Sequence, residues 1–211
     1  MKRISITITA LALSAAIAAQ DMKTLFTNMP DAYIPQLEIA WRKDLIDLFQ
    51  SGKEARLKNT MNGYSQLWNL TDDYIRVQTT ERSSIEIKLL PLVNNTYIIC
   101  MVSTVEGPAP DSRLQFYTTD WQPLDARQMF TPIDADYFIK DDVDRESAAF
   151  KDAQALLDMD LIKYSLSPDN TNLTATYATT LYLSPTERAK VSPFLKDVPK
   201  TCTWEKAFFS K

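Results

Sequence analysis

Residues 75–102 read IRVQTTERSSIEIKLLPLVNNTYIICMV, and this stretch decides the fold class. Apolar and polar residues alternate at 75–78 and again at 85–89, which is typical of β-strands with one buried and one wet face. Residues 97–102 are apolar on both faces and predict a central strand that is covered on both sides. Two asparagines, which tolerate a positive φ, supply a tight turn before that strand. The stretch therefore predicts consecutive antiparallel strands.

The same pattern extends on both sides of this stretch. Alternation resumes after a break at 107–110, and the predicted meander of five or six antiparallel strands covers residues 55–124. A helix is expected before it, because Leu37, Trp41 and Leu45 recur at helical spacing with charged residues between them.

A smaller α-β-β-α-β segment is predicted for residues 141–211, packed on the same core as the helix and meander of residues 20–140. Asp144 is expected to cap its first helix. The second strand is expected to reach from 173 to 183, and residues 201–209 would close the segment as a strand.

The clearest helix signal in this segment is a capping box at 184–187, with Ser184 at the cap, Pro185 in the first helical position and Glu187 at the third. Single helices thus interrupt runs of strands, which predicts an α+β fold rather than a parallel α/β sheet. Because a helix followed by strands occurs twice, two similar lobes are an alternative arrangement.

The first 19 residues are predicted to be a signal peptide. Lys2 and Arg3 precede an apolar run at 4–17, and residues 16–18 offer the small-x-small pattern that signal peptidase recognises. The run is shorter than the ~20 apolar residues of a membrane-spanning helix, and no cysteine follows the cleavage site for lipid attachment. We therefore expect a periplasmic or secreted protein that does not span the membrane after cleavage and is not a lipoprotein.

Composition describes a globular chain and excludes one class of partner. Hydrophobic residues make up 45% and charged residues 24%, which is ordinary for a folded domain. The formal net charge is −4 and becomes more negative when Lys2 and Arg3 are removed. This sign argues against nucleic acid as a partner.

Two cysteines in an oxidising compartment predict a single disulfide between Cys100 and Cys202. The bridge would close a loop of about 100 residues and would stabilise the fold by constraining the unfolded chain. The alternative is a pair of buried thiols, since cysteine is among the most buried residue types.

Several catalytic chemistries are missing. The chain has no histidine, which removes Ser-His-Asp and Cys-His devices, and its three glycines cannot form a phosphate-binding loop. No cofactor is predicted. An enzyme would have to use carboxylates, such as Asp44 with Asp47 or Asp72 with Asp73, so a hydrolase acting on envelope polysaccharide is one alternative function.

Asp142, Asp144 and Glu146 form the candidate metal site, because hard oxygen ligands at alternating positions can hold Ca²⁺. The stretch lacks the glycine and the distal glutamate of a calcium loop. The alternative is a solvated turn whose acids favour the positive end of the following helix.

Aromatic residues at strand ends form the candidate ligand-binding face, namely Trp68, Tyr74, Tyr117 and Trp121. They favour a non-catalytic envelope protein that binds a protein, a peptide or a glycan through one face of its sheet. A structural component of an envelope assembly is the remaining alternative, and it predicts a large exposed apolar patch.

Several segments together carry a family resemblance: DM at 21–22, MPD at 29–31, DLID at 44–47, LLP at 89–91, TV at 104–105, DSRLQFY at 111–117 and WQPL at 121–124. The chain resembles a family of exported proteins of about 200 residues from Gram-negative anaerobes, known as a domain of unknown function. The likeness covers nearly the whole chain after the predicted signal peptide. It implies a periplasmic or secreted α+β protein and supplies no catalytic residue.

Overall fold

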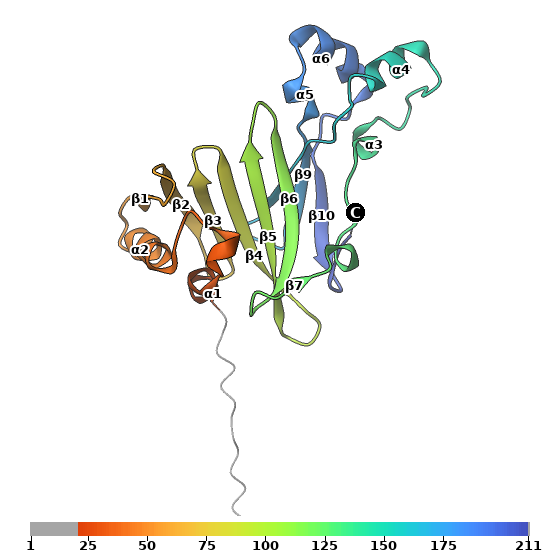
Figure 1. Ribbon diagram of the computed structural model, residues 1–211. Coiled ribbons are helices and arrows are strands. Elements are labelled where there is room, and N and C mark those ends of the chain that lie inside the picture. The colour runs from red at the N-terminus through yellow and green to blue at the C-terminus, as the bar shows by residue number, and fades with distance from the viewer. Residues whose placement is uncertain (1–20, 211) are drawn as a thin grey trace, which may run out of the picture.

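The computed structural model describes residues 21–210. Its centre is a seven-stranded antiparallel sheet whose strands lie side by side in chain order (Figure 1). The strands are β1 (Arg56–Lys58), β2 (Tyr64–Leu70), β3 (Tyr74–Thr80), β4 (Ser83–Pro91), β5 (Tyr97–Glu106), β6 (Pro110–Thr118) and β7 (Pro123–Leu124). The predicted α+β fold with an antiparallel meander is confirmed. The sheet exceeds the expected five or six strands because its two edge strands, β1 and β7, are very short.

A second antiparallel sheet of four strands, in the order β11-β10-β9-β8, packs on one face of the first. It contains β8 (Ile162–Leu166), β9 (Asn172–Tyr177), β10 (Lys200–Glu205) and β11 (Phe208–Ser210). Its edge strand β8 lies against β4, β5 and β6. The two sheets share an apolar cluster that includes Cys100, Phe116 and Trp204.

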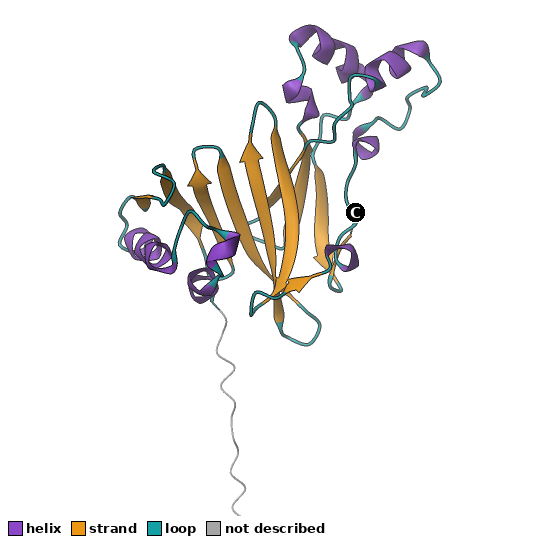
Figure 2. Cartoon of the chain, viewed as in Figure 1, coloured by secondary structure: helices purple, strands orange, loops and turns teal. Residues whose placement is uncertain are grey.

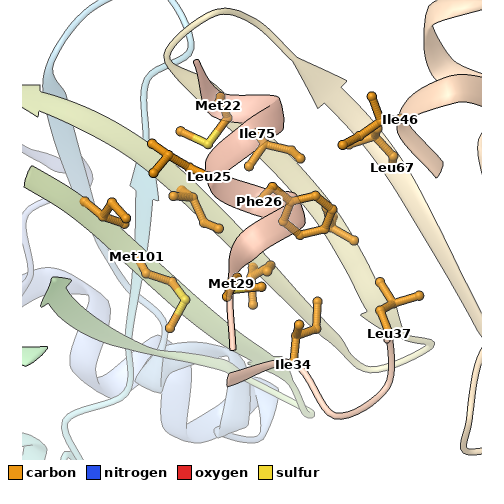
Figure 3. Close-up of a cluster of buried hydrophobic side chains, with 14 of the residues drawn as sticks. Met22, Leu25, Phe26, Met29, Ile34, Leu37, Ile46, Leu67, Ile75 and Met101 are labelled. Atoms are coloured by element: carbon orange, nitrogen blue, oxygen red, sulfur yellow. The ribbon is translucent and has the colours of Figure 1, made fainter. Parts of the chain in front are cut away.

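Helices α1 (Met22–Asn28) and α2 (Ile39–Gln50) cover the opposite face of the first sheet. Figure 3 shows Met22, Leu25 and Phe26 of α1 directed toward side chains of the strands. The central strands are therefore covered on both faces. This explains why residues 98–102 of β5 are all buried, as their apolar composition predicts.

The polar side of β4 differs from the prediction. Glu86 and Lys88 alternate with apolar residues and were expected on a wet face, but both are buried, at 3% and 1% exposure. The reason is that β8, nearly 80 residues further along the chain, lies over this side of β4. Alternation within β4 carries no information about that cover.

The remaining helices lie beyond one end of the sheets (Figure 2): α3 (Ala135–Phe138), α4 (Ala148–Gln154), α5 (Thr179–Tyr182) and α6 (Pro185–Val191). Three 3₁₀ turns connect elements: η1 (Asp31–Tyr33), η2 (Ala126–Gln128) and η3 (Ser192–Phe194). The capping box of α6 is confirmed, because Ser184 Oγ accepts from Glu187 N while Glu187 Oε2 accepts from Ser184 N.

Three local predictions for the second segment are wrong. Helix α4 begins after Ser147, whose hydroxyl accepts from Phe150 N, and not after Asp144, whose carboxylate accepts from Glu146 N in the preceding turn. The strand expected to reach residue 183 ends at Tyr177, since α5 follows.

The expected closing strand is a hairpin instead. Lys206 and Ala207 have positive φ values of 50° and 64°, and this turn reverses the chain between β10 and β11. The two sheets also differ in strand number, so the two parts of the chain are not similar lobes.

The predicted signal peptide lies outside the described residues. Within residues 21–210, none of the helices has the length and apolarity needed to cross a membrane.

Candidate functional site

The four aromatic residues predicted to form a ligand-binding face do not share one surface. Trp68 on β2 is 41% exposed, but Tyr74, Tyr117 and Trp121 are buried, at 3%, 1% and 4% exposure. Tyr74 belongs to the cluster between the two sheets, whereas Tyr117 and Trp121 belong to the cluster under α1 and α2. Trp68 is therefore the only one of the four that can meet a partner at the surface.

Tyr117 and Trp121 fasten the N-terminal segment to the sheet. Their rings lie 5.5 Å apart, and both pack against Tyr33 of η1, at 4.8 and 5.9 Å between centroids. Trp121 Nε1 donates a hydrogen bond to Leu25 O at 3.1 Å. Burial raises the pKa of Tyr117 to about 12. These contacts give both residues a role in packing.

Trp68 belongs to a different group, which strand pairing places on one exposed face. Arg56 of β1 pairs with Gln66 of β2, and Gln66 pairs with Gln78 of β3. Because side chains two residues apart in a strand share a face, Tyr64 and Arg76 lie on the same side as these three residues. The ring of Trp68 lies under Arg76 and so joins them.

We call Arg56, Tyr64, Trp68 and Arg76 the arginine–aromatic face. The Arg56 guanidinium carbon lies 4.2 Å from the centroid of the Tyr64 ring, and that of Arg76 lies 4.8 Å from the Trp68 ring. Tyr64 is 47% exposed, comparable to Trp68. At exposed sites, cation–π contacts of this kind favour the stacked arrangement by about 0.5–1 kcal/mol. The face therefore presents two aromatic rings, each with a positive charge over it.

A buried carboxylate lies at the border between this face and the second sheet. Glu86 Oε1 is 3.8 Å from Arg76 Nε, and Glu86 Oε2 accepts a hydrogen bond from Leu166 N at 2.7 Å. Ser165 Oγ donates to the same carboxylate. Burial raises the pKa of Glu86, while Leu166 N, Arg76 and Ser165 act in the opposite direction. Burial, followed by the charge of Glu86, also raises the pKa of Tyr74.

Lys88, next on the same side of β4, is the second buried charge at this border. Its Nζ lies 2.8 Å from Asp73 Oδ2 and donates to Pro168 O at 3.1 Å. Glu86 and Lys88 thus use their charges to bind β8 and the turn after it. The contacts of Glu86 with β8, and of Lys88 with the turn after β8, join the two sheets.

The carboxylate pairs considered for hydrolysis lie elsewhere. Asp73 is bound to Lys88, as described above. Asp44 and Asp47, three residues apart on α2, line a surface depression of ≈ 380 Å³ together with Lys53.

The acidic stretch before α4 does not gather as a metal site. The described residues contain no group of three or more acidic or cysteine side chains that could hold a metal ion. Asp144 Oδ1 accepts from a backbone N–H, and Glu146 pairs with Lys151 at 2.7 Å. Asp142 is exposed in the turn between them and Lys140. The stretch is a solvated turn, which was the alternative interpretation.

The two cysteines are both buried in the cluster between the sheets, Cys100 on β5 and Cys202 on β10. No disulfide joins Cys100 to Cys202 in the described part of the chain. Burial raises the pKa of the Cys100 thiol well above its usual value, with the charge of Glu86 adding to the effect. The structure thus has the second of the two alternatives, in which cysteines fill the core.

Comparison with known proteins places the chain in a family. The family model described as "Protein of unknown function (DUF3256)" matches residues 14–209. The chain belongs to this family. No curated protein matches it.

The DUF3256 chain is also similar to a solved structure, described as the structure of a domain of an uncharacterized protein from Porphyromonas gingivalis W83. The two share 27% sequence identity and superpose with a TM-score of 0.80. The match covers 89% of this chain and 96% of that chain. The resemblance to a domain of unknown function is confirmed.

Sequence reasoning identified Trp68 but missed the two arginines and Tyr64. A usable signal was present, because Trp68 and Arg76 lie on either side of the turn between β2 and β3. Arg76 pairs with Asn69, and Trp68 precedes Asn69 at a register shift in the hairpin. No comparable signal marks Arg56, which reaches Tyr64 from an edge strand of three residues.

Proposed function

We propose that this DUF3256 protein is a non-catalytic interaction module that binds an acidic polypeptide through the arginine–aromatic face. The observation that carries the proposal is the pairing of two exposed aromatic rings with two guanidinium groups on one open side of the sheet. Tyrosine, tryptophan and arginine are the residues most enriched among those that dominate binding energy in protein interfaces.

The rigidity of this face supports the proposal. Each ring has a guanidinium over it, and both rings stand on β2, which is paired with β1 on one side and β3 on the other. Binding costs ~0.5–1.5 kcal/mol for each rotamer-rich side chain that must be immobilised. Side chains that already favour one arrangement avoid part of this cost, so the face suits a partner that it meets with little rearrangement.

Charge identifies the class of partner. Arg56 and Arg76 lie on the face, and Lys58 extends it along β1. Of these three cations, only Arg76 forms an ion pair within residues 21–210, and its partner is the buried Glu86. The local positive charge contrasts with the formal net charge of −4 of the whole chain. Complementary charge steers association and selects partners, so we expect acidic side chains opposite this face.

The proposed place of action is the periplasm or the cell exterior. The support is the N-terminal sequence, in which a positive start, an apolar run and a small-x-small pattern precede residue 20. An export assay tests this part independently: the chain fused to a reporter should be exported, and deleting residues 1–19 should retain the reporter in the cytoplasm.

The binding proposal is tested with poly-L-glutamate as an acidic polypeptide and polygalacturonate as an acidic glycan, both by isothermal titration. Trp68→Ala should weaken binding of poly-L-glutamate about 30-fold, since an aromatic hot spot contributes ~2 kcal/mol. Arg56→Gln should weaken it about fivefold and reduce its salt dependence. Tyr97→Ala and Arg127→Gln, which remove an exposed ring and an exposed guanidinium elsewhere, serve as matched controls.

Retained affinity in Trp68→Ala and Arg56→Gln, or equal losses in the two controls, would overturn the assignment of the face. Binding of polygalacturonate alone would assign the same face to acidic glycans and refute the polypeptide.

A further inference from the structure

A separate pocket is lined by residues from the end of the second sheet and from the helices beyond it. Figure 1 shows these helices beyond one end of the sheets. Its volume is ≈ 280 Å³, and its principal lining residues are Phe138, Tyr177, Thr180, Arg188, Lys196 and Val198. They come from α3, the end of β9, α5, α6 and the loop before β10. None of these elements contributes to the arginine–aromatic face.

One side of the pocket is aromatic. Phe138 and Tyr177 stack with their ring centroids 5.2 Å apart and their planes inclined by 17°. Phe138 is buried, whereas Tyr177 is half-buried and lines the pocket next to it. Val198, 66% exposed, belongs to the rim. An apolar group entering the pocket would cover the exposed parts of Tyr177 and Val198 and exclude water from them.

Arg188 is held in place at the pocket by backbone carbonyls. Its Nε donates to Thr180 O at 3.0 Å and its Nη2 donates to Leu183 O at 3.3 Å. Carbonyl oxygens fix the direction of the guanidinium but do not neutralise its charge. Within residues 21–210, no carboxylate forms an ion pair with Arg188.

Two further charged residues, Lys196 and Asp197, line the pocket with Arg188. Lys196 pairs with Asp141 at 2.9 Å and donates to Tyr137 O, so it is already neutralised. Asp197 also lines the pocket but makes no ion pair with Arg188 among the described residues. A fixed guanidinium can bind a carboxylate through two parallel hydrogen bonds.

We propose that this pocket binds a small amphipathic carboxylate, with its apolar group between Tyr177 and Val198 and its carboxylate on Arg188. The volume is slightly below the ~300–1,000 Å³ of pockets for drug-sized ligands, which suits a ligand of about the size of a single aromatic acid. Thr180, which also lines the pocket, carries a hydroxyl that could donate to the same carboxylate. Affinity for such a small ligand is expected in the range of about 0.1–1 mM.

The probe is 3-phenylpropionate, and 3-phenylpropionamide is its uncharged analogue. Each is titrated into the ¹⁵N-labelled chain, and amide shifts are followed by NMR. We expect saturable shifts at Phe138, Thr180 and Val198 with the acid and binding at least about tenfold weaker with the amide. Arg188→Gln should weaken binding of the acid about tenfold, whereas Lys190→Gln, on the same helix, should leave it unchanged.

Because Arg188 also bonds to two carbonyls, a second variant keeps the proposal testable if Arg188→Gln does not fold. Val198→Asp adds a negative charge at an exposed rim position and should weaken binding of the acid more than of the amide. The proposal is refuted by an absence of shifts at these amides at 10-fold the expected Kd, by equal binding of acid and amide, or by undiminished binding in both variants.

Discussion

Replacing Glu86 by glutamine tests which effect on its negative charge is larger. Burial between the sheets disfavours the charge, and the hydrogen bonds to the carboxylate favour it. Glu86 is 3% exposed, and its carboxylate accepts hydrogen bonds from Leu166 N and Ser165 Oγ of β8. Glutamine keeps the length of the side chain and one acceptor oxygen, so the bond from Leu166 N is retained. The substitution therefore removes the charge with little change in packing.

The expected sign follows from the pKa of Glu86, which burial raises above the usual 4.5. The folded chain then holds the proton more tightly than the unfolded chain does. Between the unfolded and folded pKa values the unfolded chain binds fewer protons, so the free energy of unfolding falls as pH rises. The contribution of Glu86 to stability is fully present below the unfolded pKa and is lost as pH rises through the folded pKa.

The magnitude is about 1.4 kcal/mol for each unit by which the folded pKa exceeds the unfolded one. Glutamine resembles the protonated glutamate and carries no such penalty. The two proteins should therefore be nearly equally stable at pH 4. Above the folded pKa, Glu86→Gln should be more stable than the wild type by about 1.4 kcal/mol for each unit of the pKa difference. This gain is expected even though the hydrogen bonds to the wild-type carboxylate are charge-assisted.

The assay is urea unfolding at pH 4, 5, 6 and 7, followed by the fluorescence of the four tryptophans. Glu205→Gln, at an exposed position of β10, is the control and should show no such pH-dependent gain. A stability difference that does not change with pH, or a glutamine variant that becomes less stable than the wild type as pH rises, would refute the reasoning. Either result would mean that Leu166 N and Arg76 stabilise the charge more than burial opposes it.

Three further substitutions test other parts of the fold. Arg42 is 1% exposed and donates hydrogen bonds to three backbone carbonyls. Arg42→Met should therefore lower the free energy of unfolding by about 3–5 kcal/mol. An unchanged midpoint of urea unfolding would contradict this. Ser184→Ala removes the α6 cap and should cost about 1 kcal/mol, measured by calorimetry as a lower Tm. Trp121→Phe removes the hydrogen bond to Leu25 O. It should speed amide hydrogen exchange in α1 and leave the amides of β4 and β5 protected. Equally faster exchange in α1, β4 and β5 would argue against a local effect.

The sequence predicts the first sheet well because the sheet is built from neighbours in the chain. Each strand from β1 to β7 pairs with the next, so alternation and turns within short windows contain the needed information. Strands β1 and β7 are not predicted by alternation, because three and two residues are too few to show a period. The domain boundary at residue 140 stays a prediction.

The candidate surface is predicted less well because exposure depends on distant segments. Trp121 sits at the end of a strand, like Trp68, but its cover comes from Leu25 and Tyr33, 96 and 88 residues earlier. Glu86 is likewise covered by a strand about 80 residues later. Local sequence pattern cannot distinguish a covered from an uncovered strand end. Of the four aromatic residues predicted to bind a ligand, only Trp68 is exposed.

The chain order of the first sheet has a consequence for how the protein folds. Its hairpins close over short loops, whereas the outer layers depend on distant contacts, such as Trp121 with Leu25 and Trp204 with Pro91, 96 and 113 residues apart. Closing long loops is entropically costly before any contact compensates for it, and it slows folding. We therefore expect the meander to form first and to serve as the template on which the two ends of the chain dock, one on each side, in the rate-limiting steps.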